Sequence, residues 1–219
     1  MNNGRQEAGK SVVYLLRHGD SRQDAVRRYI GQSDDPLNET GRIQAERWQR
    51  ELRAIPLRRF FCSDLRRSVE TARIILGDRA GQVTVLPGMR EISMGRWEGL
   101  PMEEVRRTLP KEYERRGARP DCHRPPGGEN FIDLRERVLP LFETILRDES
   151  GPALLVGHAG VNRVILCHLL GMPLDNLFRL RQDYGCMNII VREKGSLRVD
   201  AMNLRPWIGF SAGDERNLK

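Results

Sequence analysis

The chain has 219 residues, of which 39% are hydrophobic and 31% are charged. This length and composition predict one globular domain with its own core, and they exclude collagen-like, coiled-coil and largely disordered proteins. The formal charge is +7, but the arginines are dispersed among acidic residues and few aromatic residues accompany them. Nucleic-acid binding would need a clustered basic patch, so we expect no nucleic-acid partner.

The cysteines and the start of the chain predict a cytoplasmic protein. No apolar run reaches the roughly 20 residues of a membrane helix, and the first ten residues lack the apolar segment of a secretory signal. We therefore expect no membrane partner, and flexible tails over residues 1–10 and 204–219. The cysteines form no metal-binding pattern, so reduced thiols and no bound metal are expected. They are Cys62, Cys122, Cys167 and Cys186.

Five elements are expected before residue 87, and they alternate between strand and helix. The first strand is a continuous apolar run, which is typical of a strand buried on both faces. Asn38 and Ser63 stand where each could accept a hydrogen bond from the first turn of a helix, so both are predicted helix caps. The expected elements are strands over residues 12–16, 57–62 and 82–86, and helices over residues 39–54 and 63–76.

Residues 87–128 break this alternation, because they are rich in glycine, proline and charge and contain at most one short helix, near residues 102–109. A loop of this length inside a compact domain is usually functional or a lid. Asn130 then caps the clearest helix of the chain, whose apolar residues follow a helical stripe. The remaining elements are a strand over residues 153–156, a helix over 161–170 and strands over 186–191 and 197–202.

The order of these elements predicts the fold class. Strands that alternate with helices are typical of an α/β fold. We expect a three-layer sandwich, with a mostly parallel central sheet flanked by helices. One domain over residues 11–203 would carry the lid-like insertion at 87–128. No internal repeat is visible, which excludes repeat architectures.

Two of the expected buried strands run directly into a histidine with a glycine close behind it. His18 follows the first strand and His158 follows the strand at residues 153–156. Ligands of open α/β sheets bind beyond the carboxyl ends of the strands, where both histidines are expected. The pattern alone leaves a structural and a functional role equally open for each of them.

The residues near these histidines indicate phosphoryl chemistry. A metal site would need a third ligand, and a serine hydrolase would need a G-x-S-x-G turn; neither pattern is present. Arg17 precedes His18, while Arg66 and Arg67 stand at the start of a helix after another strand. Arginines and helix N-termini recognise phosphate, and histidine can be the nucleophile. Taken alone, Arg66 and Arg67 are more typical of a solvated helix start.

Several short segments follow one another in an order that matches a known pattern. They are LRHGDS at residues 16–21, YIGQ at 29–32 with DPL at 35–37, SDLRRS at 63–68, RE at 90–91 with GRWEG at 95–99, PGGE at 126–129, and GHAGV at 157–161. Together they resemble the motifs of the histidine phosphatase superfamily, the phosphoglycerate mutase-like proteins, over nearly the whole chain. Asp20 stands where this family usually has glutamate.

The resemblance implies the phosphoglycerate mutase-like fold and a covalent phosphohistidine mechanism that needs no cofactor. His18 would attack phosphorus, and Glu91 would protonate the leaving alkoxide and then activate water. Arg17, Arg67 and His158 would surround the phosphoryl oxygens, where negative charge accumulates.

The resemblance also assigns residues to the substrate side, and one of them departs from the family pattern. Many members have an asparagine where this chain has Asp24, and an ionised aspartate cannot donate a hydrogen bond to phosphate. We expect Asp24 to turn toward an arginine, with Arg28 and Arg27 as first candidates, or Ser21 or Gln23 to supply the donor. The assigned residues are Arg17, Arg67, Ser21, Asp24, Gly31, Gln32 and Ala159.

The resemblance implies a phosphomonoesterase that acts on a small phosphorylated metabolite. The chain is closest in pattern to the phosphatase branch, including α-ribazole phosphatases and sugar-phosphate phosphatases. The alternatives are a phosphoglycerate mutase-type phosphotransferase and a non-catalytic binding module, and a homodimer is an open prediction. Without the resemblance, Glu98 would compete with Glu91 for the acid role. The arginines of the 87–128 region could bind a second anionic group or only face water.

Overall fold

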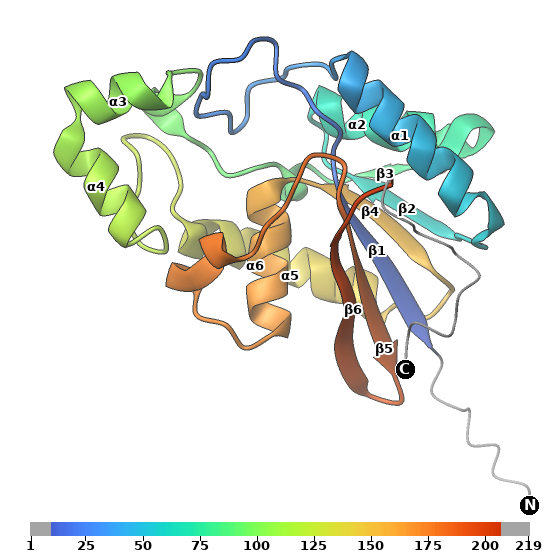
Figure 1. The fold of residues 1–219 in the computed structure, drawn as a ribbon. Helices are drawn as coiled ribbons and strands as arrows, with labels where there is room; N and C mark the ends of the chain where they lie inside the picture. The colour runs from blue at the N-terminus through green and yellow to red at the C-terminus, as the bar shows by residue number, and fades with distance from the viewer. Residues whose placement is uncertain (1–9, 207–219) are drawn as a thin grey trace, which may run out of the picture.

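The computed structural model describes residues 10–206 as an α/β sandwich built on one six-stranded sheet (Figure 1). The strands are β1 (Ser11–Arg17), β2 (Arg59–Cys62), β3 (Thr84–Val85), β4 (Ala153–Gly157), β5 (Met187–Glu193) and β6 (Ser196–Leu204). The α-helices are α1 (Glu39–Glu51), α2 (Arg66–Leu76), α3 (Met102–Thr108), α4 (Pro110–Ala118), α5 (Phe131–Arg147) and α6 (Ala159–Leu169). Short 3-10 helices are η1 (Leu52–Ala54), η2 (Gly77–Gln82), η3 (Pro87–Met89), η4 (Gly95–Trp97) and η5 (Leu174–Arg179).

The sheet has the strand order β3-β2-β4-β1-β5-β6, with its parallel part in the sequence β3-β2-β4-β1. The last two strands are antiparallel and form a hairpin. Lys194 and Gly195 connect them and both have positive φ angles, 50° and 80°, which match the twist of a two-residue hairpin turn. The predicted three-layer sandwich with a mostly parallel sheet is confirmed.

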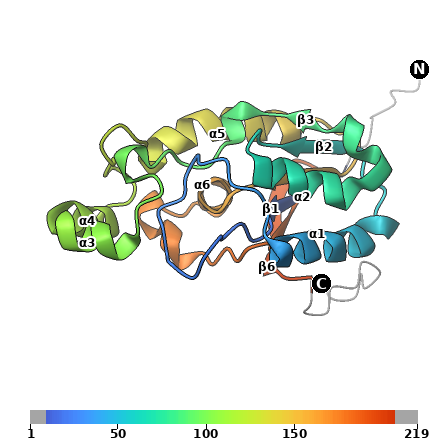
Figure 2. The ribbon, with the colours of Figure 1, turned by 90° about the horizontal axis from the view of Figure 1, so that it is seen from above.

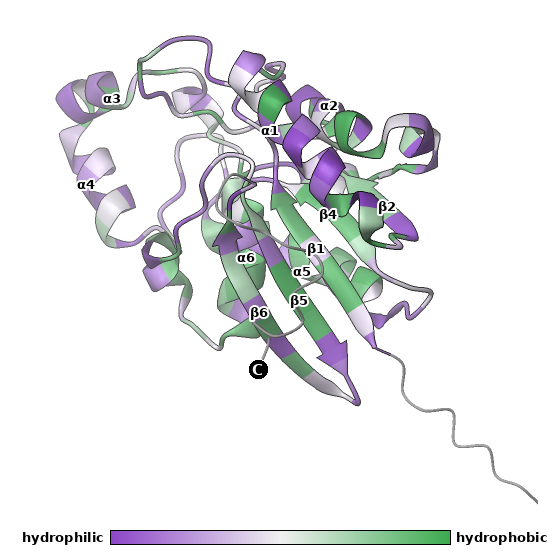
Figure 3. Ribbon diagram, turned by 45° about the vertical axis from the view of Figure 1, so that its right-hand side comes forward, coloured by the Kyte–Doolittle hydropathy of each residue, from purple (hydrophilic) through white to green (hydrophobic). Residues whose placement is uncertain are grey.

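Alternating residues of the central strands enter two separate cores. Val13 and Leu15 of β1 pack with residues of α5 and α6, whereas Leu16 packs with residues of α1 and α2. Successive side chains of a strand point to opposite faces, so the helix pairs cover opposite faces of the sheet (Figure 2). The apolar central strands contrast with the hydrophilic surface of α3 (Figure 3).

Two of the three predicted helix caps are confirmed and the third is wrong. The Asn38 side chain accepts from the Gly41 N–H, and Asn130 forms a reciprocal capping box with Asp133. Helix α2, however, begins only at Arg66 and has no side-chain cap. Ser63 lies at the end of β2 instead, and its hydroxyl is used in a long-range contact with a histidine, described below.

The prediction of at most one helix in the 87–128 region is also wrong, because α4 directly follows α3. Pro110 ends the first helix and occupies the first turn of the second, where its missing N–H costs nothing. Val105 and Arg116 are the buried residues of this helix pair, so its apolar periodicity is too weak to read from the sequence. Both helices lie beside the sandwich, near the loop that follows β1 (Figure 1).

The ends of several elements differ slightly from their predicted positions. Strand β6 reaches Leu204, inside the predicted tail, and α6 begins at Ala159. The rest of both predicted tails lies almost entirely outside the described residues. Within residues 10–206, no helix has the length and apolar character needed to cross a membrane.

Candidate active site

The sheet brings His18 and His158 together. Strands β1 and β4 are parallel neighbours, with Arg17 in register with Gly157, so the next residue of each strand is a histidine. The two imidazole rings have centroids 5.0 Å apart, and both side chains are buried. The predicted meeting of these histidines at one edge of the sheet is therefore confirmed.

The hydrogen bonds of His18 define which ring nitrogen is reactive. Its Nδ1 lies 2.7 Å from the carbonyl oxygen of Gly19, which can only accept, so Nδ1 carries the proton. Burial, together with the charges of Arg67 and Arg17, lowers the pKa of His18 well below its usual value. The imidazole is therefore neutral and has its lone pair on Nε2, as a nucleophile requires.

Arg67 holds the reactive nitrogen of His18 and the loop that follows β1. Its Nε lies 3.2 Å from His18 Nε2, while its two terminal nitrogens donate to the carbonyls of Ser33 and Gly31 at 2.5 and 2.6 Å. The side chain is 1% exposed. The neighbouring Arg66 is exposed and pairs with Glu70 at 2.7 Å. The structure thus separates the two arginines as the family pattern predicts.

Arg17 lies on the other side of His18 and faces the pocket. One terminal nitrogen donates to the carbonyl of Gln182 at 2.6 Å, and the guanidinium lies 3.6 Å from the centroid of the Tyr184 ring. Its Nε is buried without a partner. This packing fixes the guanidinium plane and leaves it donors for an anion.

Glu91 comes from the loop after η3 and reaches the first turn of α6. Its two carboxylate oxygens accept from the backbone N–H groups of Ile92 at 2.8 Å and Gly160 at 3.0 Å. A Cβ atom at Gly160 would lie 2.3 Å from the Glu91 Oε1 atom, so this approach requires glycine. Arg137 fixes the backbone from behind, since it donates to the Glu91 carbonyl at 2.9 Å.

Glu98, the other carboxylate considered for the acid role, is engaged with the loop that follows β1. It accepts hydrogen bonds from the backbone of Gly31, Gln32 and Ser33 and from the Ser33 hydroxyl. Burial would raise the pKa of Glu98, but these hydrogen bonds outweigh it and lower that pKa. Glu98 therefore stays ionised and anchors the loop that Arg67 also binds.

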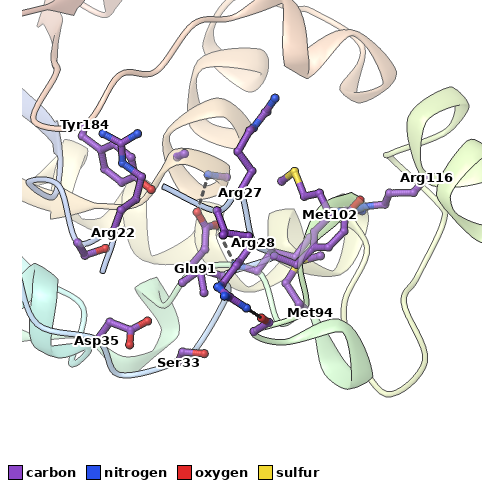
Figure 4. A pocket seen from close by; sticks show the side chains of 18 of the residues that line it. Arg22, Arg27, Arg28, Ser33, Asp35, Glu91, Met94, Met102, Arg116 and Tyr184 are labelled. Atoms are coloured by element: carbon purple, nitrogen blue, oxygen red, sulfur yellow. Dashed lines mark hydrogen bonds between the residues drawn. The ribbon is translucent and has the colours of Figure 1, made fainter. Parts of the chain in front are cut away.

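Arg17, Ser21, Glu91 and Ala159 line a pocket of about 910 Å³, to which helices α3 and α4 contribute Met102 and Arg116. His18 directly follows Arg17 and His158 directly precedes Ala159, so both histidines lie next to this lining. Figure 4 shows Glu91 between Tyr184 on one side and Arg116 on the other. A deep imidazole and several arginines at the end of a pocket can bind a phosphate group and accept its phosphoryl group.

The sequence matches the profile of the histidine phosphatase superfamily (branch 1) over residues 13–205. The chain belongs to this superfamily. It is 35% identical over 174 residues to the glucosyl-3-phosphoglycerate phosphatase of Mycolicibacterium vanbaalenii, covering 75% of this chain and 76% of that protein. It is 33% identical over 216 residues to the probable phosphoglycerate mutase GpmB of Yersinia pestis, covering 94% of each. The α-ribazole phosphatase structure from Shigella flexneri superimposes with a TM-score of 0.82 at 26% identity, covering 91% of this chain and 99% of that one.

Asp24 turns toward an arginine in this histidine phosphatase, as expected. Its Oδ2 pairs with Arg28 at 3.1 Å and its Oδ1 accepts from the Val26 N–H at 2.9 Å. Asp24 lines the pocket, but half of its side chain is exposed to solvent. The loop is not helical, so Arg28 reaches it through the local turn rather than along a helix face.

Gly31 and Gln32 are placed behind the pocket lining rather than within it. The Gly31 carbonyl accepts from Arg67, and a Cβ at Gly31 would lie 2.2 Å from the Ile92 carbonyl oxygen. The Gln32 side chain donates to the Glu91 carbonyl at 3.0 Å. Both residues therefore shape the site through its supporting loops.

Sequence reasoning missed several residues that contact the predicted site residues. Tyr184 and Gln182 lie about 165 positions from Arg17, and no local motif marks them. Ser63 was predicted to cap a helix, and Arg137 was not given a role in the site. Within residues 10–206, no group of three or more histidine, cysteine or acidic side chains is arranged to hold a metal ion.

Proposed function

We propose that this histidine phosphatase hydrolyses a small phosphomonoester through a phosphohistidine on His18. The observation that supports this most is the state of His18. Its Nδ1 proton is held by Gly19, its pKa is lowered, and its Nε2 lies beside Arg67. A buried, neutral and oriented imidazole next to unpaired arginines is suited to attack a phosphorus atom.

The reaction follows in two steps. His18 Nε2 forms a bond to phosphorus while the bond to the ester oxygen breaks, and protonated Glu91 gives its proton to the leaving alkoxide. Arg17, Arg67 and His158 contact the phosphoryl oxygens as charge builds on them. Glu91, now ionised, then takes a proton from water as the water oxygen attacks phosphorus. The P–N bond breaks, and inorganic phosphate leaves with His18 restored.

The direct test is to trap the intermediate. Enzyme mixed with labelled substrate and quenched with alkali should carry phosphate on His18 that is stable in base and labile in acid. The His18→Ala variant should lose turnover. EDTA should leave the wild-type rate unchanged. Product analysis should show inorganic phosphate rather than an isomerised phosphoester, which separates a phosphatase from a mutase. Full activity of His18→Ala would contradict the mechanism.

The outer part of the pocket points to the kind of alcohol that the enzyme takes. Among residues 10–206, three arginines are buried at 8% exposure or less: Arg59, Arg67 and Arg116. Arg59 pairs with Asp148 at 3.5 Å, whereas neither of the others forms an ion pair with a described carboxylate. Arg67 belongs to the group of residues that would contact the phosphoryl oxygens, namely Arg17, His18, Arg67 and His158, which we call the phosphate end. Because buried charges are normally paired, Arg116 fits a second anionic group on the substrate.

The surroundings of Arg116 agree with this assignment. It donates through Nη1 to the carbonyls of Pro120 and His123, both at 3.3 Å, and stacks 4.8 Å from the Phe131 ring. Burial lowers its pKa to about 10, so it is still charged at neutral pH. We therefore place phosphorylated sugars and sugar acids with a second anion ahead of α-ribazole phosphate. Phosphoglycerate, named in two relatives, carries such a carboxylate.

A matched pair of substrates tests this preference. 3-Phosphoglycerate and glycerol 3-phosphate differ mainly by a carboxylate, and the wild type should favour the first in kcat/KM. Arg116→Gln should reduce that preference by about 10- to 100-fold, the range of one charge-assisted hydrogen bond. Arg115→Gln is the control, because Arg115 is exposed on the same helix and pairs with Glu112. Equal losses on both substrates would assign Arg116 a purely structural role.

The cellular setting also remains a proposal. We infer a cytoplasmic location, which the four unpaired cysteines support, and no nucleic-acid or membrane partner. A homodimer is proposed as well, and sedimentation of the full chain tests it.

A further inference from the structure

Two buried atoms of the site, His158 Nδ1 and Arg17 Nε, have no hydrogen-bond partner among residues 10–206, and the first of them is an imidazole nitrogen. His158 is fully buried, and its Nδ1 makes no hydrogen bond, whereas its Nε2 lies 2.6 Å from the Ser63 hydroxyl. A buried polar atom without a partner costs stability, so its persistence calls for a function. The ring lies beside that of His18, so a donor on His158 would be close to the phosphorus that His18 attacks.

The hydrogen bonds of Ser63 decide where the proton of His158 resides. The Leu65 N–H points to the Ser63 oxygen at 3.4 Å, so that oxygen already accepts one hydrogen bond. No other acceptor within the described residues faces the Ser63 hydroxyl proton, which leaves His158 Nε2 as its target. Nε2 must then hold the lone pair, and the single proton of the neutral ring lies on Nδ1.

His158 stays neutral because burial and the positive charges of Arg67 and Arg17 lower its pKa well below the usual value. A neutral imidazole has only one N–H, so its tautomer decides whether it can donate a hydrogen bond to substrate. The sheet fixes the pair, since β2 and β4 are parallel neighbours with Cys62 in register with Val156. Ser63 is the first residue after Cys62 and His158 is the second after Val156, so the two lie just beyond this register.

We propose that Ser63 is a positioning residue, which holds His158 in the tautomer protonated at Nδ1 and so makes it a hydrogen-bond donor to the phosphoryl oxygens. The inference rests on the proposed function, because the phosphoryl group is what occupies that space. The serine acts through the histidine and does not contact substrate itself. Ser63, which the sequence predicted as a helix cap, would thus affect the reaction rate through His158.

The test compares Ser63→Ala with Ser68→Ala. Ser68 is the matched control, because it is also fully buried and donates to the Val156 carbonyl, yet it does not contact His158. Ser63→Ala should lower kcat about 10²-fold with little change in KM, near the lower end of the loss for one oxyanion donor. Ser63→Thr, which keeps the hydroxyl, should recover most of it. Vanadate should bind Ser63→Ala more weakly than the wild type.

Nitrogen-15 NMR measures the tautomer of His158 in the enzyme without substrate, independently of any activity assay. In ¹⁵N-labelled wild-type protein, with the resonances assigned through His158→Gln, Nδ1 should be protonated and Nε2 not. Ser63→Ala should give a mixture or a reversal. A wild-type Nε2 proton, or equal rates for Ser63→Ala and Ser68→Ala, would overturn the inference. Failure to find phosphohistidine on His18 would instead overturn the proposed function and leave the measured tautomer as it is.

Discussion

The phosphate end of the pocket and the outer helices α3 and α4 treat arginine in opposite ways. On and beside the outer helices, several arginines are exposed and paired with nearby acids. Examples are Arg106 with Glu103, Arg115 with Glu112, and Arg119 with Asp121. At the phosphate end, Arg17 and Arg67 are held by backbone carbonyls, and neither forms an ion pair with a described carboxylate.

This difference teaches how a site keeps its positive charge for a ligand. A carboxylate paired with an arginine would satisfy its donors and compete with phosphate, whereas a carbonyl orients the guanidinium without cancelling its charge. Surface ion pairs contribute little to stability, so the outer arginines serve mainly solvation. The comparison also singles out Arg116, the buried arginine of the outer region, which follows the pattern of the phosphate end.

After the loss of turnover in His18→Ala, the largest effect is expected from Glu91→Gln, which removes the transferable proton but keeps the shape of the side chain. General acid catalysis contributes about 10²–10⁴-fold, most strongly for basic leaving groups. Turnover of an alkyl phosphate should fall by that range, while p-nitrophenyl phosphate, whose leaving group needs less help, should lose much less. Steady-state rates on the two substrates measure this. Equal losses would move the acid role away from Glu91.

The second prediction separates the two neighbouring arginines directly. Arg67→Ala should lower kcat/KM by about 10²–10³-fold, because it removes one donor to the phosphoryl oxygens and frees the Gly31–Ser33 loop. Arg66→Ala is the control, since Arg66 is exposed and pairs with Glu70. It should change kcat/KM by no more than a few-fold. Similar losses in both variants would mean that net charge, rather than geometry, governs the site.

The sequence predicted the histidines and arginines of the phosphate end better than the residues that hold them in place, for a physical reason. His18 and His158 follow apolar strands, and parallel neighbouring strands must end at the same edge, so their meeting could be expected. Their partners come from distant parts of the chain: Ser63 lies 95 positions from His158. Such tertiary contacts leave no local periodicity, and the Ser63 prediction failed because a long-range hydrogen bond replaced a helix cap.

The outer region was predicted less well because little of it is buried. With Val105 and Arg116 as its buried residues, the helix pair lacks the apolar stripe that identified α5. The anchoring role of Glu98 was likewise hidden, since the N–H groups that donate to its carboxylate reach it only when the loop after β1 folds back on it. The choice of Glu91 over Glu98 rested on family resemblance, and the hydrogen bonds that hold Glu98 to the 31–33 loop are consistent with it.

The third prediction concerns pH and folding. Folding lowers the pKa of His18 and His158, so below about pH 6.5 the unfolded chain binds more protons than the native one. Stability is therefore full above that pH and falls as pH decreases, by at most about 1.4 kcal/mol per pH unit for each histidine. Urea unfolding between pH 5 and 8 measures the slope. His158→Gln should flatten it, whereas a change at the exposed His168 should not; an unchanged slope in His158→Gln would contradict the assignment.

The smallest effect is expected at Asp24, which lies between the two regions. If its carboxylate faced the phosphate at about 4 Å, the repulsion would be about 4 kcal/mol at an effective dielectric constant near 20. The structure avoids this cost, because the carboxylate pairs with Arg28 and accepts from the Val26 N–H. Hydrogen bonds from Arg28 and Val26 lower the pKa of Asp24, so the carboxylate is ionised while it is paired with Arg28.

Asp24→Asn keeps the acceptor for Val26 and weakens only an exposed ion pair, and such pairs contribute little. We therefore expect kcat/KM to change no more than a few-fold. Arg28→Gln, measured in parallel, should have a similarly small effect, although it also loses a hydrogen bond to the Gly99 carbonyl. A gain of tenfold or more in Asp24→Asn would show that the carboxylate turns into the pocket during turnover. The site would then be tuned against dianionic phosphate, and the preference for monoesters would have to be measured again against singly charged diesters.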